Sequence, residues 1–157
     1  MKKLNVHFVL IVIVFALFLA GCSGGVPSSS SFNFGGNWTM TNSTLSSTLA
    51  MSDIGSTTTA KCNIVDTNGS LTIYNFRLVN QEFMKWNTGY GSRIGNKLTG
   101  NVNGSYTNIY GDPVSMTIYF EGTINKDGIS GSGYWTQTFN VYGYFDTSSG
   151  VTIFVKG

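Results

Sequence analysis

Apolar and polar residues alternate along much of the chain after residue 31, which is the pattern of β-strands that bury one face. Residues 114–121 show it most clearly. One face of this segment carries Val114, Met116, Ile118 and Phe120, and the other carries Ser115, Thr117, Tyr119 and Glu121. The same period of two appears earlier, where Trp38 and Met40 share one face of a segment that runs from Phe34 to Thr41.

The pattern and its turn residues predict a series of short strands. Strands are expected over residues 34–41, 43–52, 60–66, 70–79, 97–110, 114–121, 129–138, 139–145 and 151–156. The segment 70–79 is apolar on both faces, so we expect it to be buried on both. Turns are expected at Asn68-Gly69, at 125–128 and at 146–150, and Asn103-Gly104 is expected to form a turn or a bulge. Between the two halves, residues 81–86 fit one helical turn and residues 87–92 fit a loop.

These elements predict an all-β domain. Eight to ten short strands without a helical pattern favour an antiparallel up-and-down barrel, and a β-sandwich is the alternative. Closure into a barrel removes the free strand edges that a secreted domain rich in Thr, Val and Tyr would otherwise expose to aggregation.

The N-terminal segment has a different character. The basic start Met1-Lys2-Lys3 precedes an apolar run of thirteen residues from Phe8 to Ala20. That run has the length of a signal-peptide core and is shorter than the roughly 20 residues that span a bilayer. It ends in Leu19-Ala20-Gly21-Cys22, which resembles the lipobox of bacterial lipoproteins.

The lipobox resemblance implies an address in the cell envelope. It implies cleavage before Cys22 and attachment of lipid to the sulfur of Cys22, so that acyl chains hold the protein on a membrane. The expected organisation is a signal peptide over 1–21, a lipidated cysteine with a Gly/Ser tether over 22–31, and one β domain over 32–157. Ser23 after the cysteine resembles the sorting signal for the outer membrane if the organism is Gram-negative.

Removal of the signal peptide changes the available chemistry. The mature chain keeps seven basic and seven acidic residues, so its net charge is about zero and no basic patch predicts nucleic-acid binding. It also loses His7, the only histidine, which excludes histidine-based triads and imidazole zinc sites. Cys62 is expected to be a small buried hydrophobe, with a mixed disulfide or a reactive thiol as the alternatives.

The carboxylates do not predict catalysis. Four of the seven acids fall in expected turns, where they serve the backbone, and Glu82 and Glu121 have no reason to meet. No spacing typical of a calcium loop occurs. We therefore expect a protein that is not an enzyme, with no catalytic residues, no metal site and no cofactor.

Gly36-Asn37-Trp38 resembles the Gly-x-Trp opening of lipocalin-like (calycin) barrels. In that family the tryptophan closes one end of the barrel and packs against a basic residue of the last strand, and Lys156 stands where such a partner would lie. The chain lacks the family's Thr-Asp-Tyr motif and has Lys in place of the terminal Arg. Two further segments, 98–100 and 133–135, resemble avidin-like barrels.

Residues of the irregular central segment are the candidates for binding. Trp86, Tyr90 and Arg93 are predicted to contact a ligand or a partner, because functional residues concentrate in loops and amphipathic rings favour interfaces. The leading hypothesis is a small apolar or amphipathic ligand inside the barrel; the alternative is a module that binds or inhibits an envelope protein. An interior cavity of several hundred Å³ would favour the ligand, and a filled interior would favour the module.

Overall fold

The computed structural model describes residues 33–48, 53–79 and 81–157. The expected signal peptide, the lipobox with Cys22 and the tether lie outside these residues. Within the described ranges, no helix has the length and apolar character needed to cross a bilayer.

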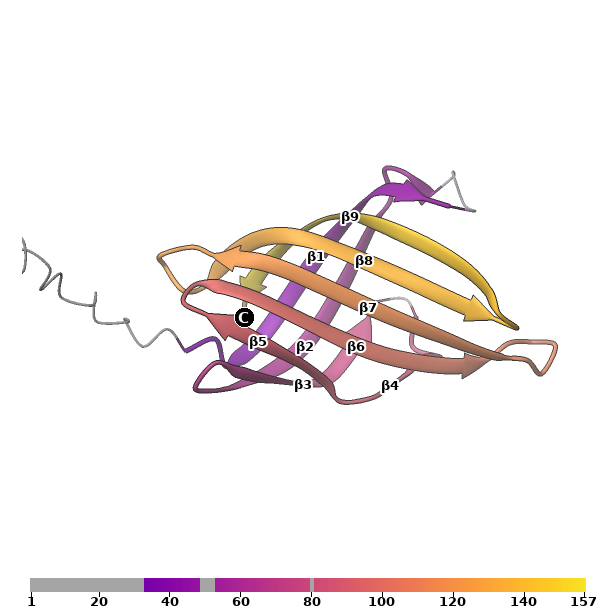
Figure 1. Cartoon of the computed structure of the whole chain (residues 1–157), viewed down its shortest axis with the longest axis horizontal. Helices are drawn as coiled ribbons and strands as arrows, with labels where there is room; N and C mark the ends of the chain where they lie inside the picture. Colours follow the sequence, from indigo (N-terminus) through magenta and orange to yellow (C-terminus); the bar gives the residue numbers. More distant parts are fainter. Residues whose placement is uncertain (1–32, 49–52, 80) are drawn as a thin grey trace, which may run out of the picture. The chain divides into compact units, whose positions relative to one another are not determined.

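The domain is an antiparallel β-barrel closed by eight strands in meander order (Figure 1). The strands are β1 (Gly36–Ser47), β2 (Thr57–Thr67), β3 (Ser70–Leu78), β5 (Gly89–Ile94), β6 (Lys97–Thr107), β7 (Pro113–Ile124), β8 (Ser130–Val141) and β9 (Tyr144–Lys156). Each pairs with the next along the chain, and β9 pairs back on β1 to complete the ring. A two-residue strand, β4 (Lys85–Trp86), pairs with β6 beyond the end of β5. The expected up-and-down barrel is confirmed, and the sandwich alternative is not.

The interior is filled mainly by the apolar residues that alternate inward, with Asn42, Thr44, Ser148 and Thr152 as its buried polar members. All four residues expected on one face of β7 are enclosed, as is Trp38. The core also contains Phe34, Met40, Ala60, Cys62, Ile64, Leu71, Ile73, Phe76, Leu78, Met84, Leu98, Val102, Ile124, Trp135 and Phe154. Burial at this scale is the main favourable term in the stability of such a domain.

Two inward-facing glycines of β6 make room for aromatic rings. A Cβ at Gly104 would lie 2.6 Å from the Trp86 ring, and one at Gly100 would lie 2.5 Å from the Phe120 ring. Asn103-Gly104 was expected to be a turn or a bulge, and this prediction is wrong. Gly104 continues the regular pairing of β6 with β7. The Trp86 ring occupies the space that a side chain at this position would need.

One strand prediction and one turn prediction fail for the same reason, which is that polar residues also occupy paired strands. Residues 43–47 continue β1 instead of opening a second strand, and residues 146–150 lie within β9. The turn between β8 and β9 is Tyr142-Gly143, with φ of 52° and 80°. Val141 and Tyr144 are paired across it, as in a two-residue hairpin whose loop residues both have positive φ.

The prediction that β3 is buried on both faces is also wrong. Tyr74 faces outward, and a bulge with Asn75 at φ 51° shifts the alternation, so that Ile73 and Phe76 both face inward. Because of the bulge, apolar residues occupy both odd-numbered and even-numbered positions of β3, although only one face of the strand is buried. Residues 81–86 form a turn and β4 instead of a helical turn, and β5 begins inside the expected loop.

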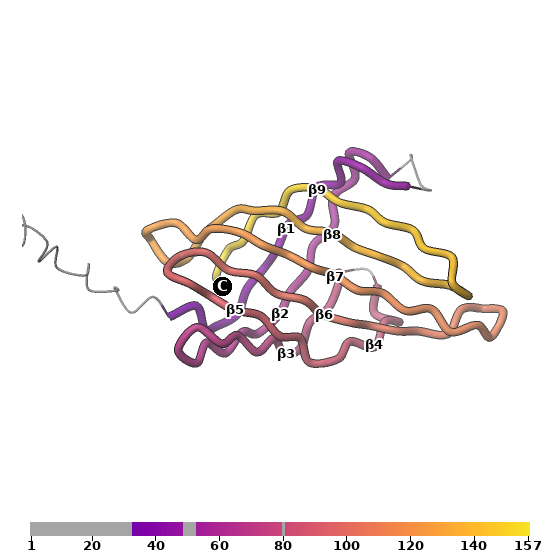
Figure 2. Tube along the Cα trace, viewed as in Figure 1, coloured from indigo at the N-terminus to yellow at the C-terminus, as the bar shows by residue number. Residues whose placement is uncertain are grey.

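The turns and strand ends gather at two opposite ends of the barrel (Figure 2). At one end, here called the proximal end, Asn33–Gly36 leads into β1 and the turns 68–69, 95–96 and 125–129 gather. At the opposite or distal end lie the β6–β7 tip (108–112) and the β8–β9 tip (142–143).

Candidate functional site

The proximal end is closed by a compact aromatic arrangement. The Phe34 and Trp38 rings stack with centroids 4.1 Å apart, and Trp38 Nε1 donates to the Phe34 carbonyl at 2.8 Å. Lys156 of β9 is the strand partner of Trp38, and its Nζ lies 5.9 Å from the Trp38 ring centroid. This contact combines a buried ring with a surface cation and seals this end of the core.

An ion pair reinforces the same end. Arg93 Nε donates to Asp66 Oδ2 at 2.6 Å, and the carboxylate also accepts from the backbone N–H groups of Phe34 and Gly69. Burial raises the pKa of Asp66, but the hydrogen bonds from Arg93, Phe34 and Gly69 outweigh it and hold that pKa below its usual value. Asp66 therefore stays ionised and ties the chain entry to β2 and β5.

The structure places the three predicted binding residues in different surroundings. Arg93 is engaged by Asp66, and Tyr90 is exposed on the outer face of β5. Trp86 packs edge to face on Phe76 with centroids 4.7 Å apart, where it lines a surface groove between β3 and the connection to β4. The three side chains do not converge on one site.

A set of exposed apolar side chains gathers at the distal end instead. We call it the distal surface, and it consists of Ile109, Tyr110, Tyr142, Tyr144 and Phe145. Between 62% and 91% of each residue is exposed. Phe83, also exposed, extends it by an edge contact with Tyr106 at 4.9 Å between centroids. Exposed apolar residues that gather at one end of a soluble domain indicate a candidate interaction surface.

Hydrogen bonds hold the β6–β7 tip in one shape. The Asn108 side chain accepts from the backbone N–H groups of Tyr110 and Asp112 at 2.9 and 2.8 Å, and its Nδ2 donates to the Asp112 carboxylate at 3.1 Å. The Asn108 backbone exchanges further bonds with Asp112 and Gly111. The loop therefore presents Ile109 and Tyr110 on a fixed frame.

The β8–β9 tip is fastened to its neighbour. The Tyr142 hydroxyl donates to the Asp112 carboxylate, and this bond raises the pKa of Tyr142. Gly143 N donates to Asn140 Oδ1 at 2.9 Å. Tyr142 also holds a left-handed φ of 52°, which the two-residue turn requires and which costs a residue with a Cβ about 1–2 kcal/mol.

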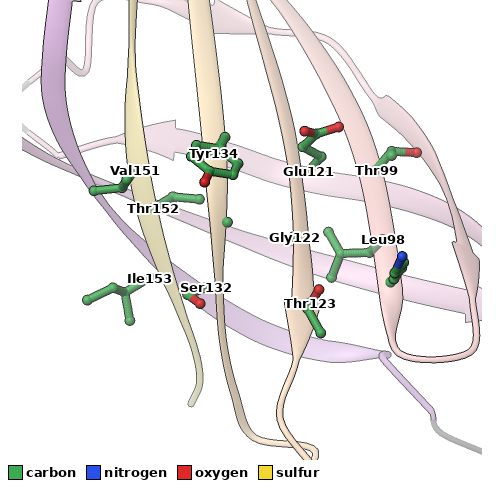
Figure 3. A pocket seen from close by; sticks show the side chains of 12 residues that line it. Leu98, Thr99, Glu121, Gly122, Thr123, Ser132, Tyr134, Val151, Thr152 and Ile153 are labelled. Atoms are coloured by element: carbon green, nitrogen blue, oxygen red, sulfur yellow. The ribbon is translucent and has the colours of Figure 1, made fainter.

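A third feature is a broad groove of about 650 Å³ on the wall of β6, β7, β8 and β9 (Figure 3). Its floor crosses Gly122 and Gly133, which are strand partners and leave the backbone uncovered. Hydroxyls of Thr99, Thr123 and Ser132 line it. The exposed ring of Tyr134 stands at its margin, and Glu121 is the one acidic residue among those that line it.

The chemistry of the described residues is otherwise sparse. Burial raises the pKa of the Cys62 thiol to about 12, so at neutral pH it is a protonated core group, as expected for a small hydrophobe. Across residues 33–48, 53–79 and 81–157, no three His, Cys, Asp or Glu side chains come together in a way that could hold a metal ion.

Sequence reasoning missed the distal surface because its residues belong to strand ends and turns. Tyr142-Gly143 was read as strand, and Ile109 and Tyr110 as the end of an alternating segment. One signal was present: Asn-Ile-Tyr-Gly-Asp and Tyr-Gly-Tyr-Phe-Asp both place aromatic residues beside a turn glycine. A solvated turn has no need of such residues.

Comparison with models of known protein families gave no match, and neither did comparison with curated proteins or with solved structures.

Proposed function

We propose that this chain is a lipid-anchored protein of the bacterial cell envelope whose barrel acts as a protein-interaction module, and not as an enzyme. The distal surface carries the proposal. The address rests on the lipobox that ends at Cys22.

The filled interior supports this alternative over a ligand carried inside the barrel. Trp38, Met116, Ile118 and Phe120 are each no more than 2% exposed and meet in the core. The grooves of about 650, 370 and 450 Å³ are lined largely by residues of the outer wall and of the β3–β4 connection. Recognition by the outside of the molecule is therefore the better-supported mode.

The course of the chain supports a distal contact. Residues 22–31 precede Asn33, so a lipid on Cys22 attaches the barrel through its proximal end. The distal surface lies at the opposite end of the strands. A contact at the distal end would leave the entry of the chain at Asn33 uncovered.

The composition of the distal surface favours a protein over a lipid surface. Its rings are mainly tyrosine, set among Asn, Gly and Asp, which is the composition of protein-binding loops with rigid aromatic anchors. The charged residues within its two tips are Asp112 and, beside them, Asp146, whereas anionic lipid attracts Lys and Arg. The fixed shape of both tips lowers the entropy lost on binding.

Photo-crosslinking in intact cells tests the proposal. A photoreactive phenylalanine analogue would replace Tyr110 or Tyr144 at the distal end, and Ile94 or Ile129 at the proximal end as matched exposed controls. We expect a discrete protein adduct from the distal positions alone. Equal adducts from both ends, or adducts with lipid only, would contradict the proposal.

A separate experiment tests the address. Labelled palmitate should enter the wild-type chain, and the Cys22→Ser variant should lose both the label and membrane fractionation. An unlabelled wild-type chain would remove the anchor from the account. The crosslinking experiment would still test the distal surface, because it does not depend on the anchor.

A further inference from the structure

Two cations face each other on the outer wall of β2 and β3. Lys61 and Arg77 are direct cross-strand partners, both are exposed, and both line a groove of about 450 Å³. Neither makes an ion pair with any described residue. Like charges directly opposite each other on neighbouring strands destabilise a sheet. The pair is therefore a cost to folding that an anion would relieve.

The bulge at Asn75 creates this pair. Ile73 faces the core, and unbroken alternation would turn Arg77 inward as well. The left-handed backbone of Asn75 shifts the register, so that Phe76 faces inward and Arg77 stands outside, opposite Lys61. Bulges re-aim side chains in this way beside binding sites.

A row of amide side chains adjoins the cations. Asn63 donates to Asn37 Oδ1, and Asn75 Nδ2 donates to Asn63 Oδ1 at 3.3 Å. These three residues line the same groove as Lys61 and Arg77. In the described part of the chain, Asn37 Nδ2 and Asn75 Oδ1 make no hydrogen bond, so the row keeps one donor and one acceptor for a ligand.

A second groove, of about 370 Å³, continues from the first and shares Asn75 and Arg77 with it. Its walls include the rings of Tyr74 and Trp86 and one carboxylate, that of Glu82, on the side away from Lys61. Gln81 Oε1 and Trp86 Nε1 line it and are enclosed without a partner among the described residues. Buried polar atoms are rarely left unpaired, and a hydroxyl that displaced the side chains covering these two atoms would satisfy both the acceptor and the donor.

We infer that the two grooves form one binding site for a sugar that carries a phosphate or a carboxylate. The Arg77 guanidinium can donate two parallel hydrogen bonds to two oxygens of a phosphate or a carboxylate, and Lys61 adds a second charge. Sugar hydroxyls both donate and accept, which suits the amide row, Gln81 and the Trp86 N–H. The rings of Tyr74 and Trp86 would contact the apolar C–H face of the sugar. The site is formed by residues of β1, β2, β3 and the connection to β4, and none of the five residues that define the distal surface lines it.

Binding is tested by calorimetry on the full chain in non-ionic detergent. The probes are glucose 6-phosphate and glucuronate, with glucose as the neutral comparison. Both acidic sugars should bind, and glucose should bind at least about tenfold more weakly, as follows from losing a hydrogen-bonded charge pair. Equal binding of glucose, or no binding of either acidic sugar at millimolar concentration, overturns the inference.

A double variant, Lys61→Thr with Arg77→Thr, should lose at least about tenfold in affinity for the acidic sugars. The matched control is Lys97→Thr with Lys126→Thr, which removes the same charge from other exposed positions. Without ligand, the Lys61/Arg77 double variant should unfold at a higher temperature, because it removes the repulsion. A lower unfolding temperature, or equal loss of affinity in the control, contradicts the inference.

A competition experiment separates the two sources of such a sugar. Lipid A, a phosphorylated glycolipid, is mixed into the micelles during titration with glucose 6-phosphate. Competition assigns the site to a glycolipid headgroup, and unchanged affinity assigns it to a soluble or polymeric sugar. Both results support the acidic-sugar chemistry that the site provides.

Discussion

The two ends of the barrel use aromatic residues in opposite ways. At the proximal end, Phe34 and Trp38 are at most 2% exposed, stacked on each other and joined by a hydrogen bond. At the distal end, Tyr110 and Tyr144 are 82% and 79% exposed. Burying a ring stabilises the fold, whereas an exposed ring on a rigid loop is available to contact a binding partner. The same residue types therefore serve stability at one end and recognition at the other.

The largest difference between the ends should appear in the free energy of unfolding. Trp38→Ala empties the stacked pair and should destabilise the full chain by about 3–5 kcal/mol in urea titrations. Tyr110→Ala, at the distal end, should change stability by no more than about 0.5 kcal/mol. Similar losses in the two variants would remove the distinction between the ends.

The ion pair of the proximal end should make stability depend on pH. Because the pKa of Asp66 is lower in the folded than in the unfolded chain, its contribution is complete above the unfolded value of about 3.9 and is lost as the pH falls through the folded value. Arg93→Met should cost about 1.5–3 kcal/mol at neutral pH.

Urea titrations from pH 6 down to pH 2 provide the measurement. The wild-type chain should lose more stability over this range than Arg93→Met, and the two curves should approach each other at the acidic limit. Parallel curves would show that the Asp66–Arg93 pair does not set the acid sensitivity.

The distal end should become more stable when its strain is removed. Tyr142→Asn places a residue that tolerates positive φ at the first turn position and should gain about 1 kcal/mol. The same change removes an exposed ring and the bond to Asp112, so crosslinking from Tyr144 should weaken. Tyr90→Asn, on the wall of β5, is the matched change and should leave crosslinking intact. A destabilised Tyr142→Asn would mean that the Asp112 bond outweighs the strain.

The smallest expected effect concerns the cation over Trp38. Lys156→Met keeps the aliphatic contact across Gly36 but removes the charge, and should cost about 0.5–1 kcal/mol in thermal or urea unfolding. Lys97→Met on the outer wall of β6 should have no comparable effect. If Lys156→Met leaves the free energy of unfolding unchanged, the Lys156 side chain acts by packing alone.

The sequence predicted the barrel because strand periodicity is a local property. The alternation over residues 114–121 and the Asn68-Gly69 turn gave the correct faces and one correct hairpin. The bulge at Asn75 was not predictable in this way, because it shows only as a change of phase between Ile73 and Phe76. The Tyr142-Gly143 turn was hidden because tyrosine is a strand former that rarely takes positive φ.

The candidate site was harder to predict than the fold. The irregular sequence around Trp86 and Arg93 predicts a binding loop, yet Trp86 packs over Gly104 and Arg93 pairs with Asp66. The exposure of Tyr110 and Tyr144 depends on which strand ends project at the distal end. That is a property of the closed barrel, so no local pattern reveals it.

The most direct test of the difference between the ends is hydroxyl-radical oxidation of tyrosines in intact cells compared with the purified chain. Mass spectrometry would quantify oxidation at Tyr110, Tyr142 and Tyr144, with the exposed wall residues Tyr90 and Tyr134 as internal references. We expect the distal tyrosines alone to be protected in cells. Equal oxidation of all five relative to the purified chain would contradict the assignment of the distal end as the docking surface.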